Sequence, residues 1–256
     1  RVDRRQRQMC IRDSNIMNKQ TFLTLLATFA LLFSFTFSCH AKGKDKAKHV
    51  VFIGLDGWGA YSLPKADMPN VKKLMEDGAY TLKKRSALPS SSAINWASMF
   101  MGAGPELHGY TEWGSKTPEL PSRVLNKNGI FPTVFQLLRD ARPEAEIGCL
   151  YEWEGIKYLV DTLSLSYHYH VADCNKTPKE LGNMASSYIK EKHPALVAIC
   201  YDGPDHTGHT AGHDTPEYYE KLKELDVYVG QIVQAVKDAG MLDDTTVSYT
   251  HLTLPT

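Results

Sequence analysis

Apolar runs alternate along this chain with segments whose apolar residues recur every three or four positions. The runs 49–55, 147–151 and 195–201 lack a polar face, which predicts strands buried on both sides of a parallel sheet. A further strand is predicted to begin at Thr245 and is followed to Val247. Helical periodicity lies between these runs, at 69–77, 93–101, 131–139, 178–192 and 216–239. The pattern predicts one doubly wound α/β domain, with a mostly parallel sheet and helices on both faces.

Neither a linker of Pro, Gly and Ser nor an internal repeat divides the pattern, so a second domain is not expected. The segment 112–128 is polar and contains proline, and we expect it to form a lid or a small insert. The chain is 43% hydrophobic, enough to bury one good-sized core. Lys and Arg (29) balance Asp and Glu (29), which gives no electrostatic case for nucleic acid binding.

The N-terminal region has the pattern of a secretory signal. A short basic start at Met17 is followed by an apolar stretch over 21–37, and we expect residues 17–41 to be a signal peptide. The predicted location is periplasmic or extracellular. A retained membrane span is the weaker alternative, and Cys39 offers a second one, as a lipid anchor to a bacterial membrane. Residues 1–16 and 248–256 are interpreted as non-native additions, so the native protein is expected to continue differently after Val247.

The candidate chemistry lies directly after two of the predicted strands. Asp56 follows the first strand, and Asp205 and His209 follow the strand 195–201 in what we expect to be a loop. Carboxyl ends of parallel strands meet at one edge of a sheet, so these side chains are expected to lie together. Carboxylate and imidazole suit zinc or a similar divalent ion. Taken alone, Asp56 is more often a turn or helix-cap residue.

Three consecutive serines, Ser90 to Ser92, precede the helix predicted at 93–101. Such a run is by default a solvated loop and helix cap. A hydroxyl at a helix start is also where free backbone amides favour an anion, and a metal-bound serine there would be an activated nucleophile.

Several other residues have more than one interpretation. His206, His213 and Asp214 are expected to be exposed polar neighbours of the site, and His108 to be structural. Trp58 and Trp96 are interpreted either as core aromatics or as walls of a pocket for a leaving group such as a nucleoside base. The cysteines suggest neither a zinc knuckle nor a disulfide framework.

These motifs together resemble the alkaline phosphatase superfamily, most closely its nucleotide pyrophosphatase/phosphodiesterase branch. The resemblance covers residues 48 to 247 and rests on motifs in the family's order, namely Gly54-Leu55-Asp56-Gly57, the helix from Pro69 to Gly78, Ser92 with Asn95, Gly102, Pro105 to Gly109, and Asp205-x-x-Gly208-His209. It implies a catalytic domain over 48–247 that is incomplete at its C-terminus.

The resemblance also implies roles for single residues. Ser92 would be the nucleophile, with Ser91 as its rival, and Asn95 would donate to a phosphoryl oxygen. Asp56 and Ser92 would bind one divalent ion, and Asp205 and His209 the other. Zinc is expected, with manganese and magnesium as alternatives. The substrate would be a small phosphate ester, cleaved through a phosphoseryl intermediate.

Other functions remain open from the sequence. A phosphomonoesterase remains open, because the sequence does not reveal what meets the extra negative charge of a monoester. A sulfatase usually needs Pro and Arg after its nucleophile, which Ser92 to Asn95 lack. A non-catalytic secreted binding protein of this fold is the alternative outside the enzymes. The family's later Asp-His pair and further His have no match here, and His251 is not expected to replace them. We therefore expect this chain to bind metal weakly and to turn over slowly. Its oligomeric state is open.

Overall fold

A computed structural model describes residues 47–172 and 177–252, with only the backbone placed at 251 and 252. The expected signal peptide at 17–41, the extension 1–16 and Cys39 lie outside the described residues. None of the helices in the described part of the chain is long and apolar enough to cross a bilayer.

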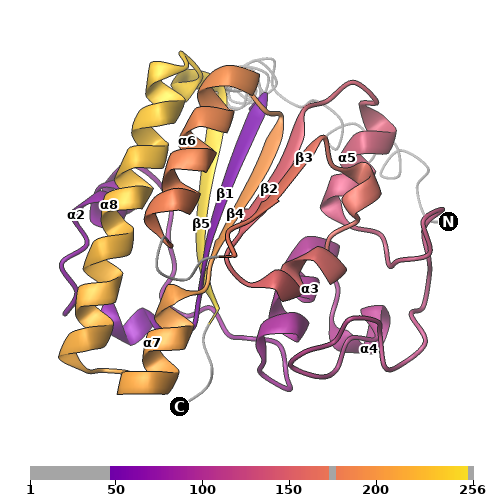
Figure 1. Ribbon diagram of the computed structural model, residues 1–256, viewed down its shortest axis with the longest axis horizontal. Helices are drawn as coiled ribbons and strands as arrows, with labels where there is room; N and C mark the ends of the chain where they lie inside the picture. Colours follow the sequence, from indigo (N-terminus) through magenta and orange to yellow (C-terminus); the bar gives the residue numbers. More distant parts are fainter. Residues whose placement is uncertain (1–46, 173–176, 253–256) are drawn as a thin grey trace, which may run out of the picture. The chain divides into compact units, whose positions relative to one another are not determined.

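Five strands form one parallel sheet in the order β3-β2-β4-β1-β5 (Figure 1). They are β1 (His49–Asp56), β2 (Ile147–Tyr151), β3 (Tyr167–His170), β4 (Leu196–Tyr201) and β5 (Thr245–Leu252). The four predicted strands are confirmed. Strand β3 was not predicted, because Tyr167–His170 alternates aromatic and imidazole side chains without an apolar run. Strand β5 continues five residues past Val247 and pairs with β1 over its whole length.

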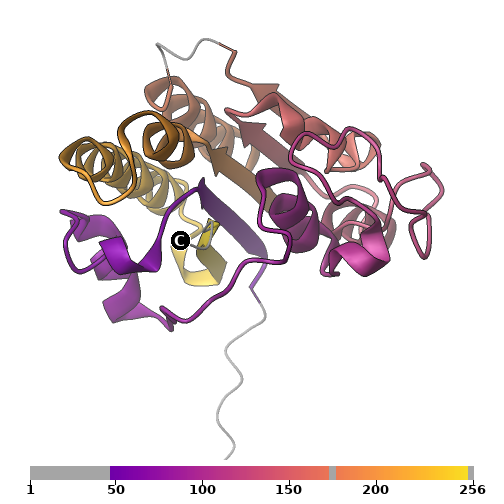
Figure 2. The same cartoon turned by 90° about the horizontal axis from the view of Figure 1, so that it is seen from below.

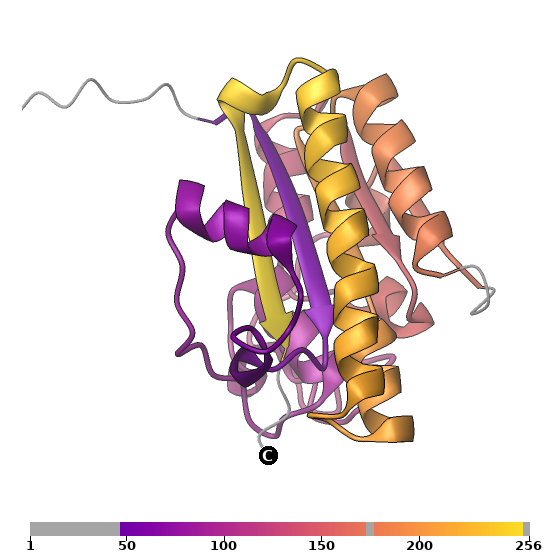
Figure 3. The same cartoon turned by 90° about the vertical axis from the view of Figure 1, so that its left-hand side faces the viewer.

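Seven α-helices connect the described strands and cover both faces of the sheet, which confirms the doubly wound fold (Figures 1 and 3). They are α2 (Pro69–Asp77), α3 (Ser92–Met101), α4 (Pro105–His108), α5 (Val134–Ala141), α6 (Lys179–Lys192), α7 (Gly203–Ala211) and α8 (Pro216–Asp238). Helix α5 begins three residues later than predicted, because the Thr133 side chain accepts a hydrogen bond from the Gln136 amide and caps it there.

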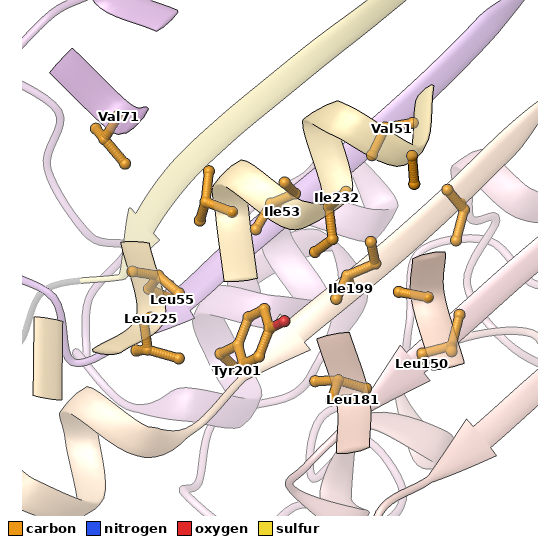
Figure 4. Packing of buried hydrophobic residues seen from close by; sticks show 14 of the residues in the cluster. Val51, Ile53, Leu55, Val71, Leu150, Leu181, Ile199, Tyr201, Leu225 and Ile232 are labelled. Atoms are coloured by element: carbon orange, nitrogen blue, oxygen red, sulfur yellow. The ribbon is translucent and has the colours of Figure 1, made fainter. Parts of the chain in front are cut away.

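The two faces of the sheet carry separate apolar cores, because successive strand residues point to opposite sides. On one face, Val51, Ile53 and Leu55 of β1 pack with α6 and α8 (Figure 4). On the other face, Phe52 contacts the core built from α3, α5 and the alternate residues of β2 and β4. Helices thus pack on both faces of the sheet, and this packing fixes the positions at which its strands end.

The predicted loop after β4 is a helix, α7, and this prediction was wrong. Pro204 stands in its first turn, where the missing N–H costs nothing. Glu152, which follows β2, accepts the backbone amides of Asp202 (2.6 Å) and Gly203 (3.1 Å) through Oε2. A carboxylate 50 residues away therefore satisfies the start of α7, and local sequence could not reveal it.

The segment predicted as a lid or insert contains neither helix nor strand between 112 and 128. It is nevertheless tied to the domain. The Ser122 hydroxyl donates to the His108 carbonyl (2.7 Å), and the Asn126 and Asn128 amides donate to Asp161 (2.7 and 2.8 Å). These bonds hold the polar segment in place beside the carboxyl edge of the sheet, which Figure 2 shows from below.

Candidate active site

Asp56 lies at the carboxyl end of β1 and is 4% exposed. Its Oδ1 accepts the Gly57 amide at 2.9 Å, and its Oδ2 accepts Trp96 Nε1 at 2.9 Å. Burial, followed by the charges of Asp205 and Asp202, raises the pKa of Asp56 to about 8, while hydrogen bonds from Trp96 and Ser92 oppose the rise. Asp56 is thus a buried carboxyl that a nearby cation would strongly favour in its charged form.

Gly57 brings helix α7 against the end of β1. It adopts a left-handed conformation, with φ of +64°, and a Cβ atom there would stand 2.4 Å from Asp205 Cα. Only glycine permits both the turn and this close approach. The Asp56 and Asp205 side chains therefore come from backbones in direct contact, although 149 positions separate them in the sequence.

Asp205 and His209 lie one turn apart on α7, with His209 Nε2 3.3 Å from Asp205 Oδ2. Asp205 is 8% exposed, whereas the His209 side chain is 64% exposed. Burial raises the pKa of Asp205, and the charges of His209, His213 and His206 oppose that rise. The i, i+4 spacing thus presents one carboxylate and one imidazole to the same point.

Ser92 is the first residue of α3 and is 7% exposed. Its side chain lies near enough to Asp56 to lower the pKa of that carboxyl, and Ser92 lines a cavity. The rival Ser91 is the N-cap residue, but its side chain makes no capping bond, and its Oγ is buried without a hydrogen-bond partner. Of the two serines, Ser92 is the one beside Asp56.

Asn95 lies one turn along α3 and does not line the cavity. Its Oδ1 accepts the Ala87 amide at 2.7 Å, and its Nδ2 donates to the Ser91 carbonyl at 3.0 Å. These bonds fix the segment that leads into α3, and so fix Ser92. The contact of Asn95 with a phosphoryl oxygen stays a prediction.

The cavity has a volume of about 410 Å³. Its walls combine two tryptophans with carboxylate, imidazole and hydroxyl side chains: Ser92, Trp113, Trp153, Asp202, Asp205, His206 and His209. The sequence predicted neither Trp113, Trp153 nor Asp202 as site residues. The sequence did hold one signal for Trp113, since a tryptophan within a polar segment can indicate a binding residue. In the structure Trp113 is 64% exposed.

The tryptophans proposed from sequence as pocket walls do not line this cavity. Trp58 is buried and donates to Ser62 Oγ (2.9 Å), and Trp96 is buried and donates to Asp56. The aromatic wall comes instead from Trp113 and Trp153, whose ring centroids are 6.2 Å apart. Trp58 and Trp96 are therefore core aromatics, whereas Trp113 and Trp153 line the cavity.

The remaining polar candidates from the sequence either bond to residues outside the cavity or lie at the edge of the cavity. His108 is fully buried between Ser98 Oγ and the Tyr110 amide (3.1 Å each), which confirms a structural role. His213 packs on Tyr218, and Asp214 bonds to Lys65 at the surface. His206 is exposed, as expected, and also lines the cavity.

The donor set suits a divalent cation, but it is short of ligands. The charges of Asp202 and Asp205 both act on Asp56, so three carboxylates share one region that a bound cation would neutralise. Asp205 and His209 supply one carboxylate oxygen and one imidazole nitrogen. In the described part of the chain, no group of three or more His, Cys, Asp or Glu side chains is arranged to hold a metal ion. Two ligands fit each expected ion, fewer than the three or four that zinc sites use.

The fold and this cavity define an α/β protein with a polar site at the carboxyl edge of its sheet. The family described as type I phosphodiesterase / nucleotide pyrophosphatase matches residues 50–249, and the chain belongs to it. The match confirms the resemblance to that branch of the alkaline phosphatase superfamily.

Similar proteins include the bis(5'-adenosyl)-triphosphatase enpp4 of Mus musculus, 25% identical over 217 residues, covering 80% of this chain and 47% of that protein. The ectonucleotide pyrophosphatase/phosphodiesterase family member 1 of Mus musculus is 23% identical, covering 75% of this chain and 22% of its own length. The solved structure of murine ectonucleotide pyrophosphatase/phosphodiesterase 5 with AMP shares the fold, with a TM-score of 0.62, 17% identity, and 80% and 56% of the two chains covered. This chain spans about half the length of the bis(5'-adenosyl)-triphosphatases of Mus musculus and Bos taurus that it matches.

Proposed function

We propose that the protein is a metal-dependent phosphoric ester hydrolase of the phosphodiesterase/nucleotide pyrophosphatase type, with Ser92 as its nucleophile. The observation that carries this proposal is the convergence of three distant segments. The end of β1, the start of α3 and one side of α7 carry Asp56, Ser92, Asp205 and His209, which lie close together. Family membership supports the class of reaction.

Each of these residues has a role in the proposed reaction that fits its surroundings. Ser92 Oγ attacks phosphorus, the bond to the leaving oxygen breaks, and a phosphoseryl ester forms that water then hydrolyses. The start of the ten-residue helix α3 favours the negative charge of the phosphoryl group. Asp56 and Ser92 would hold one divalent ion, and Asp205 and His209 the other. When bound, zinc, or else manganese or magnesium, would supply Lewis acidity toward the phosphoryl oxygens.

Trp113 and Trp153 support a substrate with an aromatic group next to the phosphate. Their side chains form an apolar wall on a cavity whose other lining residues are polar. Aromatic rings stack well on nucleobases. Two similar proteins point the same way, since one is a bis(5'-adenosyl)-triphosphatase and the structure of the other holds AMP. A small-molecule nucleotide ester is therefore the substrate we propose.

Export of the protein is also proposed, from the sequence of residues 17–41 alone. Mass spectrometry of the mature protein from a bacterial host would test it. A free N-terminus near Ala41 supports secretion, a diacylglyceryl mass on Cys39 supports a lipid anchor, and a chain that keeps Met17 contradicts both.

The test of the hydrolase compares Ser92→Ala with Ser91→Ala. Hydrolysis of bis(p-nitrophenyl) phosphate, p-nitrophenyl phosphate and p-nitrophenyl sulfate is measured with added zinc and with chelator. We expect slow hydrolysis of the diester, abolished by chelator. Ser92→Ala should lower it by more than about a thousandfold or to background, while Ser91→Ala keeps it. Equal rates in the wild type and Ser92→Ala contradict Ser92 as the nucleophile. Binding of AMP without hydrolysis at any metal concentration would favour the non-catalytic binding protein.

A further inference from the structure

Asp202 occupies the N-cap position of α7 but does not cap the helix. An aspartate at this position ordinarily accepts a backbone amide of the first turn, and that is the default interpretation of Asp202. Here its side chain makes no capping hydrogen bond. Glu152 instead accepts the amides of Asp202 and Gly203, at 2.6 and 3.1 Å. The carboxylate of Asp202 is therefore not used to stabilise the helix.

The Asp202 side chain instead forms part of the cavity wall, together with Ser92. Among the described residues, no hydrogen bond or ion pair engages its carboxylate. Its charge nevertheless acts on Asp56 at the end of β1, and it feels the charges of Asp205, His206 and His209. Asp202 thus adds a negative charge to the site beyond the residues proposed to bind metal.

Besides His206 and His209, the cavity offers no side chain that could balance this charge. Its lining residues, all within the described part of the chain, include no Lys or Arg. A phosphodiester carries one negative charge, whereas a phosphate monoester carries close to two above its second pKa of about 6. A fixed carboxylate beside the reacting phosphate therefore repels the monoester more strongly, and partial exclusion of water strengthens the difference.

We propose that Asp202 is a specificity-determining residue whose negative charge favours monoanionic phosphodiesters over dianionic phosphate monoesters. The inference rests on the proposed function, because it takes the phosphoryl group to bind beside Ser92. It specifies the charge of the preferred substrate and assigns the discrimination between diesters and monoesters to one side chain. Glu152 contributes indirectly, since it caps α7 in place of Asp202.

The test measures binding, so it does not depend on turnover. Methyl phenyl phosphate, a diester, and phenyl phosphate, a monoester, are titrated at pH 8 with zinc present, and quenching of tryptophan fluorescence gives the two dissociation constants. Both compounds carry one phenyl ring and differ mainly in charge. We expect Asp202→Asn to lower the ratio of the monoester to the diester dissociation constant by about tenfold, which corresponds to about 1.4 kcal/mol.

Three controls separate this role from others. Asp202→Glu restores the charge and should restore most of the ratio. Asp214→Asn removes a carboxylate that bonds to Lys65 outside the cavity, and it should leave the ratio unchanged. Asparagine also suits the positive φ of 66° at position 214. Calorimetry should give Asp202→Asn the zinc affinity of the wild type.

The outcomes are distinguishable. If neither phenyl compound binds the wild type, both the proposed function and the role of Asp202 are overturned. If both bind and Asp202→Asn leaves their ratio unchanged, the role of Asp202 alone is overturned. A loss of zinc affinity of tenfold or more in Asp202→Asn would make Asp202 a metal ligand instead.

Discussion

The indole Nε1 of Trp96 donates a hydrogen bond of 2.9 Å to Oδ2 of Asp56, joining helix α3 to the end of β1. Trp96 is 1% exposed and stacks on Phe100. The helix that carries Ser92 at its start therefore also holds Asp56 through its second turn. One helix therefore positions both the Ser92 hydroxyl and the Asp56 carboxylate.

Trp96→Phe should weaken zinc binding at the proposed site and should also destabilise the fold. Phenylalanine keeps the stacking on Phe100 but loses the hydrogen bond that opposes the raised pKa of Asp56. A larger fraction of Asp56 is then protonated at pH 7, and we expect zinc affinity to fall about tenfold by calorimetry. The free energy of unfolding should fall by about 1.5–3 kcal/mol. Trp58→Phe, which removes a buried indole donor to Ser62, should destabilise without weakening zinc binding. Equal zinc affinities in both variants would contradict the link between Trp96 and the site.

Gly57→Ala should separate α7 from Asp56. The added Cβ must overcome both the left-handed φ and the contact with Asp205 Cα. The matched variant is Gly240→Ala, because Gly240 has φ of +68° and its Cβ would meet nothing within 4 Å. In urea unfolding we expect Gly240→Ala to lose about 1–2 kcal/mol from the conformation alone. Gly57→Ala should lose at least about 2 kcal/mol more, through overpacking. Similar losses would mean that the contact between Gly57 and Asp205 is easily relieved.

Glu152 should make the metal-free protein less stable as pH rises. Burial raises the pKa of Glu152 to about 7, from an ordinary value of 4.5. The folded state therefore holds a proton that the unfolded state releases. This stabilising contribution is fully present below about pH 4.5 and is lost as pH rises through about 7. Between pH 5 and 8 the loss is about 2 kcal/mol.

Glu152→Gln keeps an oxygen that accepts the Asp202 and Gly203 amides but cannot titrate. Its free energy of unfolding, measured with chelator at pH 5 and pH 8, should therefore fall less than that of the wild type. Glu154→Gln is the matched control, because a hydrogen bond from Lys157 lowers the pKa of Glu154, and its titration lies below this range. A Glu152→Gln variant with the wild-type dependence between pH 5 and 8 would show that Glu152 is ionised throughout.

Trp113→Ala should weaken nucleotide binding without unfolding the protein. Trp113 is 64% exposed, so little packing is lost, whereas stacking of a base on an aromatic side chain contributes about 1–3 kcal/mol. We expect the dissociation constant for AMP, measured with zinc present, to rise about tenfold or more. Tyr80→Ala is the control, since Tyr80 is similarly exposed, at 63%, but does not line the cavity. Equal AMP affinities in the two variants would remove Trp113 from the substrate site.

The sequence by itself determined the class of fold, because buried parallel strands appear as uninterrupted apolar runs. It also placed Asp56 at the end of a strand, because the end of such a run is visible in the amino-acid sequence. It also predicted Asp205 and His209 as a pair, since both closely follow the end of a buried strand, although it placed them in a loop and not on helix α7.

Only the tertiary structure decided what surrounds them. The segment expected to be a loop is helix α7, whose first amides bond to Glu152. The aromatic wall consists of Trp113 and Trp153 and not of Trp58 and Trp96. Asp202 lines the cavity. Each of these features depends on contacts between segments separated by tens of positions. Periodicity and propensity report which face of an element is apolar, whereas the partner that meets each polar side chain is set by packing.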